Sequence, residues 1–224
     1  MRPALHTARA WIGVHSVKPA LVLLAVSAAL SLMGAKAMLD SLGFMVFETP
    51  VSLLLLVPTI AGVAVAVGTD NTARIPLPEP LRLIGTRLGW MTVLTMAAAA
   101  AANLGQLIGP AVPWQAGLRN TLVHASLAVA TSALGYISVA WLPPVGLTLA
   151  SMLFGYPPSE PRYYWWAVIM EKEVTSGQWA SVIGAFTAAA CIYALAPARR
   201  LHLGKHPFTA APERQADLLV RSKP

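Results

Sequence analysis

The sequence predicts an all-α polytopic membrane protein with six transmembrane helices. Hydrophobic residues make up 56% of the 224-residue chain and charged residues only 11%, which is about half the charged share of a soluble domain. A bilayer core about 30 Å thick is crossed by roughly 20 apolar residues in a helix. Five stretches meet or nearly meet this length almost without charge: 19–39, 50–68, 89–108, 120–142 and 179–196.

The spans and their short connections account for nearly all of the chain. We therefore expect one transmembrane domain over residues 19–197, an amphipathic cytoplasmic lead-in over 1–18 and a basic cytoplasmic tail over 198–224. Leu5, Ala8 and Trp11 could form the apolar face of an interfacial helix, although a positively charged lead-in without a helix fits equally well. The single cysteine, Cys191, excludes a disulfide framework and a thiolate metal site.

The basic residues predict the orientation of the chain. With six crossings and both termini cytoplasmic, the outer side holds only Lys36, Arg119, Arg162 and Lys172, and the inner side holds the other 12 of the 16 Lys and Arg. This bias follows the positive-inside rule of membrane proteins. The net charge of +7 is thus read as a topology signal and not as a nucleic-acid-binding surface. Attraction of the tail to anionic lipid is a secondary expectation.

The second predicted span begins at Pro50, and Pro58 is expected to kink it. The longest polar connection on the inner side follows, and it ends in a predicted short helix over residues 78–88. Leu81, Ile84 and Leu88 recur there at helical spacing. Such a helix can dock a cytoplasmic partner or lie on the bilayer surface, and the sequence alone favours neither.

The third predicted span contains the alanine run 97–102, followed by Gly105 and Gly109. Small residues let membrane helices approach closely, so this run is a candidate interface between two copies of the chain. Scattered polar residues in the third and fourth spans are candidates to line a pathway, although each is also an ordinary helix–helix hydrogen bonder. These residues are Asn103, Gln106, His124 and Thr131.

The fifth apolar piece is short. Pro143 and Pro144 interrupt the chain, and the 12 residues of 145–156 would extend only about 18 Å as a helix. This piece is either a short span or part of a re-entrant hairpin, and the charge bias favours a crossing. The outer segment 157–178 then brings the aromatic run 163–166 close to charged residues, which suits a re-entrant-like segment at the membrane–water interface.

Motifs for catalysis are missing from the sequence. There is no nucleophile turn, no HExxH pair and no GxxxxGK[ST] loop to cradle phosphates. The acidic residues all lie outside the centres of the spans, where a proton-driven transporter usually carries one. We therefore expect that the chain is not an enzyme and has no cofactor of its own, and that an active transporter would need ATP on a partner subunit.

The layout resembles the membrane subunit of an ABC transporter of the ABC-2 exporter type. The resemblance rests on the six spans, the inner helix 78–88, the break at 141–144 before a short fifth span and the aromatic outer segment 163–173. It implies a permease subunit in the cytoplasmic membrane, assembled with an ABC ATPase subunit and a second permease subunit. The inner helix would be the coupling helix that contacts the ATPase, through Glu79, Leu81, Arg82, Ile84 and Arg87.

Two alternatives belong to other classes of protein. One is an accessory or scaffold membrane protein that binds a partner through the same inner loop without transport. The other is an intramembrane enzyme with an unfamiliar site. Co-purification of an ATPase would favour the permease over both.

Overall fold

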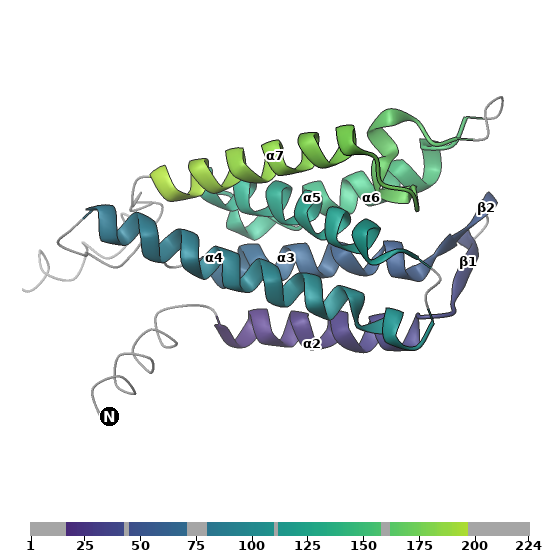
Figure 1. The fold of residues 1–224 in the computed structure, drawn as a ribbon, viewed down its shortest axis with the longest axis horizontal. Coiled ribbons are helices and arrows are strands. Elements are labelled where there is room, and N and C mark those ends of the chain that lie inside the picture. The colour runs from purple at the N-terminus through teal and green to yellow at the C-terminus, as the bar shows by residue number, and fades with distance from the viewer. Residues whose placement is uncertain (1–16, 43–44, 71–79, 110–111, 158–161, 197–224) are drawn as a thin grey trace, which may run out of the picture.

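The computed structural model describes residues 17–42, 45–70, 80–109, 112–157 and 162–196. Residues 1–16 of the predicted lead-in and the whole predicted tail lie outside this part of the chain. Six α-helices make up most of the described residues (Figure 1): α2 (Val17–Met33), α3 (Val57–Thr69), α4 (Pro80–Asn103), α5 (Trp114–Ala133), α6 (Leu142–Phe154) and α7 (Ser176–Leu195).

The six helices form a bundle in which successive helices run in opposite directions (Figure 1). We call one end of the bundle the entry end; α2, α4 and α6 begin there, and α3, α5 and α7 end there. We call the other end the hairpin end, because the strands lie there. The described part of the chain therefore begins and ends at the same end of the bundle.

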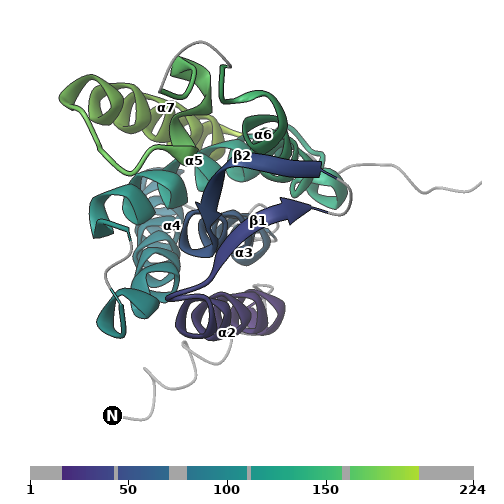
Figure 2. The ribbon, with the colours of Figure 1, turned by 90° about the vertical axis from the view of Figure 1, so that its right-hand side faces the viewer.

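A β-hairpin follows α2, and its presence corrects the predicted start of the second span. Strand β1 (Met38–Leu42) pairs with the antiparallel strand β2 (Met45–Ser52) at the hairpin end (Figure 2). A short 3-10 helix, Leu53–Leu55, leads into α3 at Val57. The predicted span at 50–68 begins too early, because its first residues continue a strand that contains Val46, Phe47 and Val51, residue types that favour strands.

The predicted separate inner helix at 78–88 is also corrected. The 24 residues of α4 run without a break from Pro80 to Asn103, so the predicted short helix and third span form one element. Pro80 is the first residue of α4, a position that tolerates proline because its N–H would have no partner in the helix. No further proline occurs until Pro110, and Gly85 and Gly89 do not interrupt the helix.

The predicted fourth and fifth spans have different limits in the structure. Helix α5 ends at Ala133, nine residues before the predicted end at 142, and Gly135 with φ of 99° turns the chain after it. Helix α6 begins at Leu142, and Pro143 and Pro144 occupy its first turn. The proline pair therefore starts a helix. The predicted outer segment contains a 3-10 helix, Trp165–Met170, packed beside α6.

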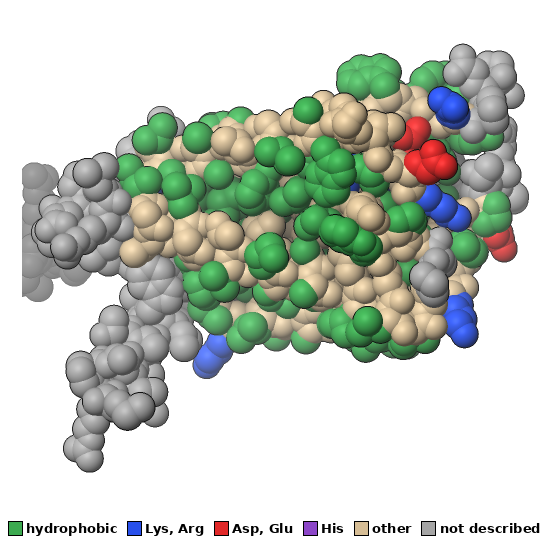
Figure 3. All heavy atoms as spheres, in the orientation of Figure 1, with side chains coloured by type: hydrophobic (Ala, Val, Ile, Leu, Met, Phe, Trp, Pro, Cys, Tyr) green, Lys and Arg blue, Asp and Glu red, His purple; other side chains and the backbone are tan. Residues whose placement is uncertain are grey.

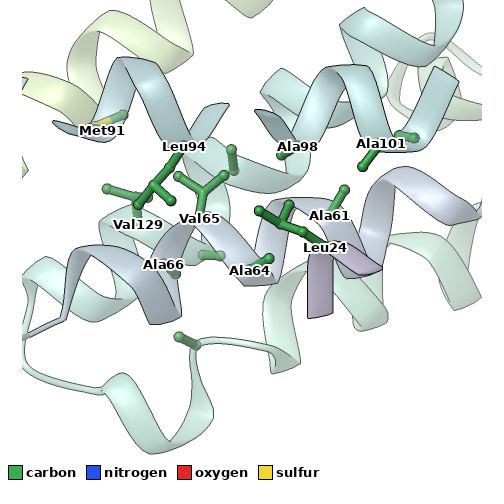
Figure 4. Close-up of a cluster of buried hydrophobic side chains, with 14 of the residues drawn as sticks. Leu24, Ala61, Ala64, Val65, Ala66, Met91, Leu94, Ala98, Ala101 and Val129 are labelled. Atoms are coloured by element: carbon green, nitrogen blue, oxygen red, sulfur yellow. The ribbon is translucent and has the colours of Figure 1, made fainter. Parts of the chain in front are cut away.

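Small and apolar side chains fill the space between α2, α3, α4 and α5 (Figure 4). The labelled members of this core include Leu24, Ala61, Val65, Leu94, Ala98 and Val129. Four alanines of the run 97–102 are buried within the chain, namely Ala98, Ala99, Ala101 and Ala102. The run thus packs mainly against helices of its own chain, and only Ala97 and Ala100 of it are exposed.

On the face drawn in Figure 3, hydrophobic side chains are spread along the length of the bundle. Leu21, Val22, Val93, Met96 and Ile183 are each more than half exposed. Among the described residues, three helical segments are long and apolar enough to cross a membrane: Ile84–Leu107, Ile137–Phe154 and Ser176–Leu195. Val17–Met33 and Leu53–Thr69 are shorter apolar helical segments. This pattern fits a helical membrane protein.

Helix α5 has 20 residues but is not one of these apolar segments. It packs against α3, α4, α6 and α7, and Arg119, Asn120, Thr121 and His124 are completely buried in it. A helix surrounded by other helices can carry polar residues, because they bond to the protein and avoid the hydrocarbon. Helix α5 carries five buried polar residues, more than any other helix among the described residues.

Candidate functional site

Four of the five residues predicted to contact an ATPase belong to the first part of α4: Leu81, Arg82, Ile84 and Arg87. Glu79 is outside the described residues, and the side chains of Leu81 and Arg82 are not described, although both residues belong to the first turn of α4. Ile84 is half-buried, and Gly85 and Thr86 are exposed. Figure 1 shows that α4 begins beyond the end of α7, so its first turns project from the bundle at the entry end.

Arg87 differs from this exposed group, because it is only 3% exposed. Its Nη1 donates hydrogen bonds to the carbonyl oxygens of Ala194 and Ala196, at 3.3 and 3.2 Å. These carbonyls end α7, and the last carbonyls of a helix have no partner within it and carry partial negative charge. Arg87 therefore caps the end of α7. Its Nε is buried without a hydrogen-bond partner among the described residues.

Two further side chains bind the end of α3 at the same end of the bundle. Trp90 of α4 donates from Nε1 to the carbonyl oxygen of Gly68, at 2.8 Å. Tyr193 of α7 donates its hydroxyl to the carbonyl oxygen of Thr69, at 3.2 Å. We call Arg87, Trp90 and Tyr193 the end junction. It joins three helices, because α4 and α7 each bind the end of α3 and α4 also binds the end of α7.

A second polar group lies in the interior, between α3, α5 and α6. Thr59 Oγ1 is 3.3 Å from His124 Nε2 and 2.9 Å from Thr148 Oγ1. Thr148 donates its hydroxyl to the carbonyl oxygen of Pro144, so Thr59 must donate to Thr148 and accept from the Nε2–H of His124. His124 Nδ1 is then an acceptor, and it is buried without a partner among the described residues.

The four residues proposed to line a pathway are not brought together. Asn103 and Gln106 are half-buried near the hairpin end, where Gln106 donates from Nε2 to Asn103 Oδ1 at 2.6 Å. His124 is in the interior, and Thr131 lies near the entry end and donates to the Leu127 carbonyl within its own helix. Three of them bond within one helix or its continuation, as ordinary hydrogen bonders do, and His124 bonds across to α3.

A third polar network centres on Arg119, which is completely buried. Its Nη2 donates to the carbonyl oxygen of Glu171 at 2.6 Å, and its Nη1 donates to the carbonyl oxygen of Glu173 and to Gln178 Oε1. Its Nε donates to Asn120 Oδ1, and Asn120 in turn donates to the carbonyl oxygens of Leu55 and Ile169. This network fastens residues 169–173 to the beginnings of α5 and α7.

The Glu171 carboxylate completes this network. It accepts a hydrogen bond from Gln178 Nε2, and Gln178 also forms a capping box with Thr175 at the start of α7. Sequence reasoning placed Arg119 only as an outer charge near the end of a span. Its burial could have been foreseen by starting the fourth helix directly after Pro113, which puts Arg119 and Asn120 in its second turn.

Within the described residues, no group of three or more His, Cys, Asp or Glu is placed to hold a metal ion. Comparison of the chain with protein-family models, with curated proteins and with solved structures gives no match. Its function is therefore inferred from the fold and from these three polar groups.

Proposed function

We propose that the chain is the transmembrane permease subunit of an ATP-driven exporter of the ABC-2 type. The observation that carries the proposal is the projection of the first turns of α4 beyond the end of α7 at the entry end. A separate ATPase subunit would dock on these turns, and a second permease subunit would complete the pathway. ATP would bind to the partner, and membrane lipid would surround the apolar face of the bundle.

The alternating helices support six crossings with both termini in the cytoplasm. The charged residues whose side chains are described lie at the two ends of the bundle: Lys18, Asp70 and Arg87 near the entry end, and Lys36, Asp40, Arg119, Arg162, Glu171, Lys172 and Glu173 near the hairpin end. The 16 basic residues of the whole sequence favour the entry end as the cytoplasmic side. The membrane proposed is the cytoplasmic membrane.

The pathway is proposed to form between two subunits. His124 is completely buried within its own chain, so the half-buried Asn103, Gln106 and Thr131 are the remaining candidates to line it. An interface between subunits in lipid relies on close packing and a few hydrogen bonds.

Co-purification tests the proposal. The tagged chain is solubilised in mild detergent, and we expect an ABC ATPase to co-purify with it and to hydrolyse ATP. Ile84→Asp should abolish this, because a charge is placed in an apolar contact at a cost of a few kcal/mol. Gly177→Asp is the matched control at the hairpin end, where an added Cβ meets nothing within 4 Å. Loss of the ATPase in both variants, or in neither, would contradict docking at α4.

The same experiment separates the alternatives. A scaffold protein would bring down a partner without ATPase activity. Hydrolysis of ATP by the isolated chain would contradict the permease proposal, because the sequence lacks a phosphate-cradling loop.

A further inference from the structure

Arg87 belongs to the same helix as the proposed docking turns and lies directly after them. It is buried, and its positive charge faces the last carbonyls of α7. The partners are 107 and 109 residues apart in the sequence. Capping the end of α7 therefore requires that α4 and α7 keep a fixed position relative to each other at the entry end.

The face of α4 that carries Arg87 continues along the helix. Trp90, Met91 and Leu94 follow at helical spacing; Met91 and Leu94 are buried, and Trp90 is half-buried and bonded to Gly68 of α3. Gly68 itself lies against Leu94, with a Cβ built on it only 2.7 Å from Leu94 Cδ1. The end of α3 is thus held by α4 from two positions one turn apart, and by Tyr193 from α7.

Arg87 and Tyr193 are buried and Trp90 is half-buried, so displacing one of these helices from the others would break hydrogen bonds that are shielded from water. The ends of α3 and α7 are therefore expected to move together with the first part of α4. The hydrogen bonds of the end junction described above run between α3, α4 and α7, and α2 contributes none of them. The first turn of α2 carries the exposed Lys18, from which the displacements of α4 and α7 relative to α2 can be measured.

We propose that Arg87 transmits displacement of the docking turns of α4 to the end of α7, with Trp90 and Tyr193 carrying it to the end of α3. This inference rests on the proposed function and names the residues that transmit a displacement caused by the docked ATPase to the other helices. Arg87 is in this view a positioning residue. It need not touch the ATPase, because its guanidinium is turned into the bundle.

The single native cysteine allows a direct test. Cys191 is exposed on the last turns of α7, and a Cβ added to Gly85 on α4 meets nothing within 4 Å. Spin-label distances are measured from Lys18→Cys on α2 to Cys191, and separately from Lys18→Cys to Gly85→Cys in a Cys191→Ala background. Both are recorded in the complex with its co-purified ATPase, without nucleotide and after trapping with ADP and vanadate.

In the otherwise unchanged protein we expect trapping to shift both distances. With Arg87→Gln, the shift measured at Gly85→Cys should persist and the shift at Cys191 should be lost. Arg162→Gln removes an exposed arginine at the hairpin end and should leave both shifts unchanged. A residue that only capped α7 would lower the stability of the complex but would not separate the two shifts.

The outcomes distinguish this inference from the proposed function. If an ATPase co-purifies, trapping shifts both distances and Arg87→Gln keeps both shifts, the inference is overturned and the permease proposal stands. If no ATPase co-purifies, or trapping shifts neither distance in the unchanged protein, both fall. Should Arg87→Gln fail to assemble, Arg87→Met carries the test, because methionine cannot donate to the carbonyls of Ala194 and Ala196. An undiminished shift at Cys191 in this variant would overturn the inference.

Discussion

Gly62 of α3 packs directly against His124 of α5. A Cβ built on Gly62 would lie 2.5 Å from the His124 Cβ and 2.7 Å from the Ala125 nitrogen. The two helices therefore approach as closely as their backbones allow, and the imidazole of His124 reaches Thr59 one turn earlier on α3. This contact holds the central helix α5 against α3.

Gly62→Leu should lower the stability of the bundle strongly. The new side chain would meet backbone atoms of α5, and overpacking of this kind costs about 1–3 kcal/mol or more. Thermal unfolding in detergent measures the effect. Gly184→Leu on α7 is the matched control, because a Cβ there meets nothing within 4 Å. Equal melting temperatures for the two variants would show that α3 and α5 are not in close contact.

Arg119→Gln should release the outer segment from the bundle. The shorter side chain leaves the carbonyls of Glu171 and Glu173 without their donor, and losing a hydrogen bond from a charged donor costs about 1.5–3 kcal/mol. The buried Ile169 reports the change: in an Ile169→Cys, Cys191→Ala background, a water-soluble maleimide should label the protein only when Arg119→Gln is also present. Arg162→Gln, at an exposed arginine, should leave the introduced thiol protected. Rapid labelling with Arg119 intact would contradict the network.

Thr59→Val should destabilise the interior hydrogen-bond chain while keeping the volume of the side chain nearly unchanged. The variant loses the acceptor of His124 Nε2–H and the donor to Thr148, so we expect a loss of about 1–3 kcal/mol. Thr59→Ser keeps the hydroxyl, and its free energy of unfolding, measured by SDS titration, should be close to that of the unchanged protein. If valine were as stable as serine, the hydroxyl of Thr59 would not hold this chain together.

The orientation of the chain is checked with cysteines at both ends of the bundle. In a Cys191→Ala background, Gly85→Cys at the entry end should react with an impermeant thiol reagent only after the cells are opened. Gly177→Cys at the hairpin end should react in intact cells. The expectation follows from the 12 of 16 basic residues assigned to the inner side. The reverse pattern would place the termini outside, and labelling of both positions from one side would contradict the proposed crossings between them.

The helices of the fold were largely foreseeable from the apolar stretches, because a membrane helix must be apolar where it faces lipid. The predicted ends of the helices were wrong where a segment does not face lipid. Residues 50–52 were predicted to begin a span but continue a strand, and hydropathy does not separate these two structures. Helix α5 begins six residues before the predicted start at 120, because its first turns carry the polar Gln115 and Arg119, and Arg119 is buried within the protein.

The candidate site was harder to foresee for a related reason. Arg87 was predicted to contact the ATPase from the inner helix 78–88, whereas its side chain is buried and its carbonyl partners lie more than 100 residues away in the sequence. A local sequence pattern does not reveal a contact between residues so far apart in the chain. His124 was identified as a hydrogen-bonding residue, whereas Thr59 and Thr148, its partners in the chain of hydrogen bonds, stand in apolar stretches without a local signal.

The enclosed position of α5 also limits the order in which the chain can enter the bilayer. Under the proposed topology, α5 leaves the ribosome after α3 and α4, but before residues 171–178 that satisfy Arg119. A helix that carries Arg119, Asn120, Thr121 and His124 partitions less favourably into lipid by itself than an uninterrupted apolar helix. We therefore expect the helices synthesised earlier to assist the insertion of α5. Arg119 can form its hydrogen bonds to residues 171–178 only after the start of α7 has been synthesised. A chain truncated before residue 171 would lack these partners of Arg119, and we expect it to be unstable and to be degraded in the cell.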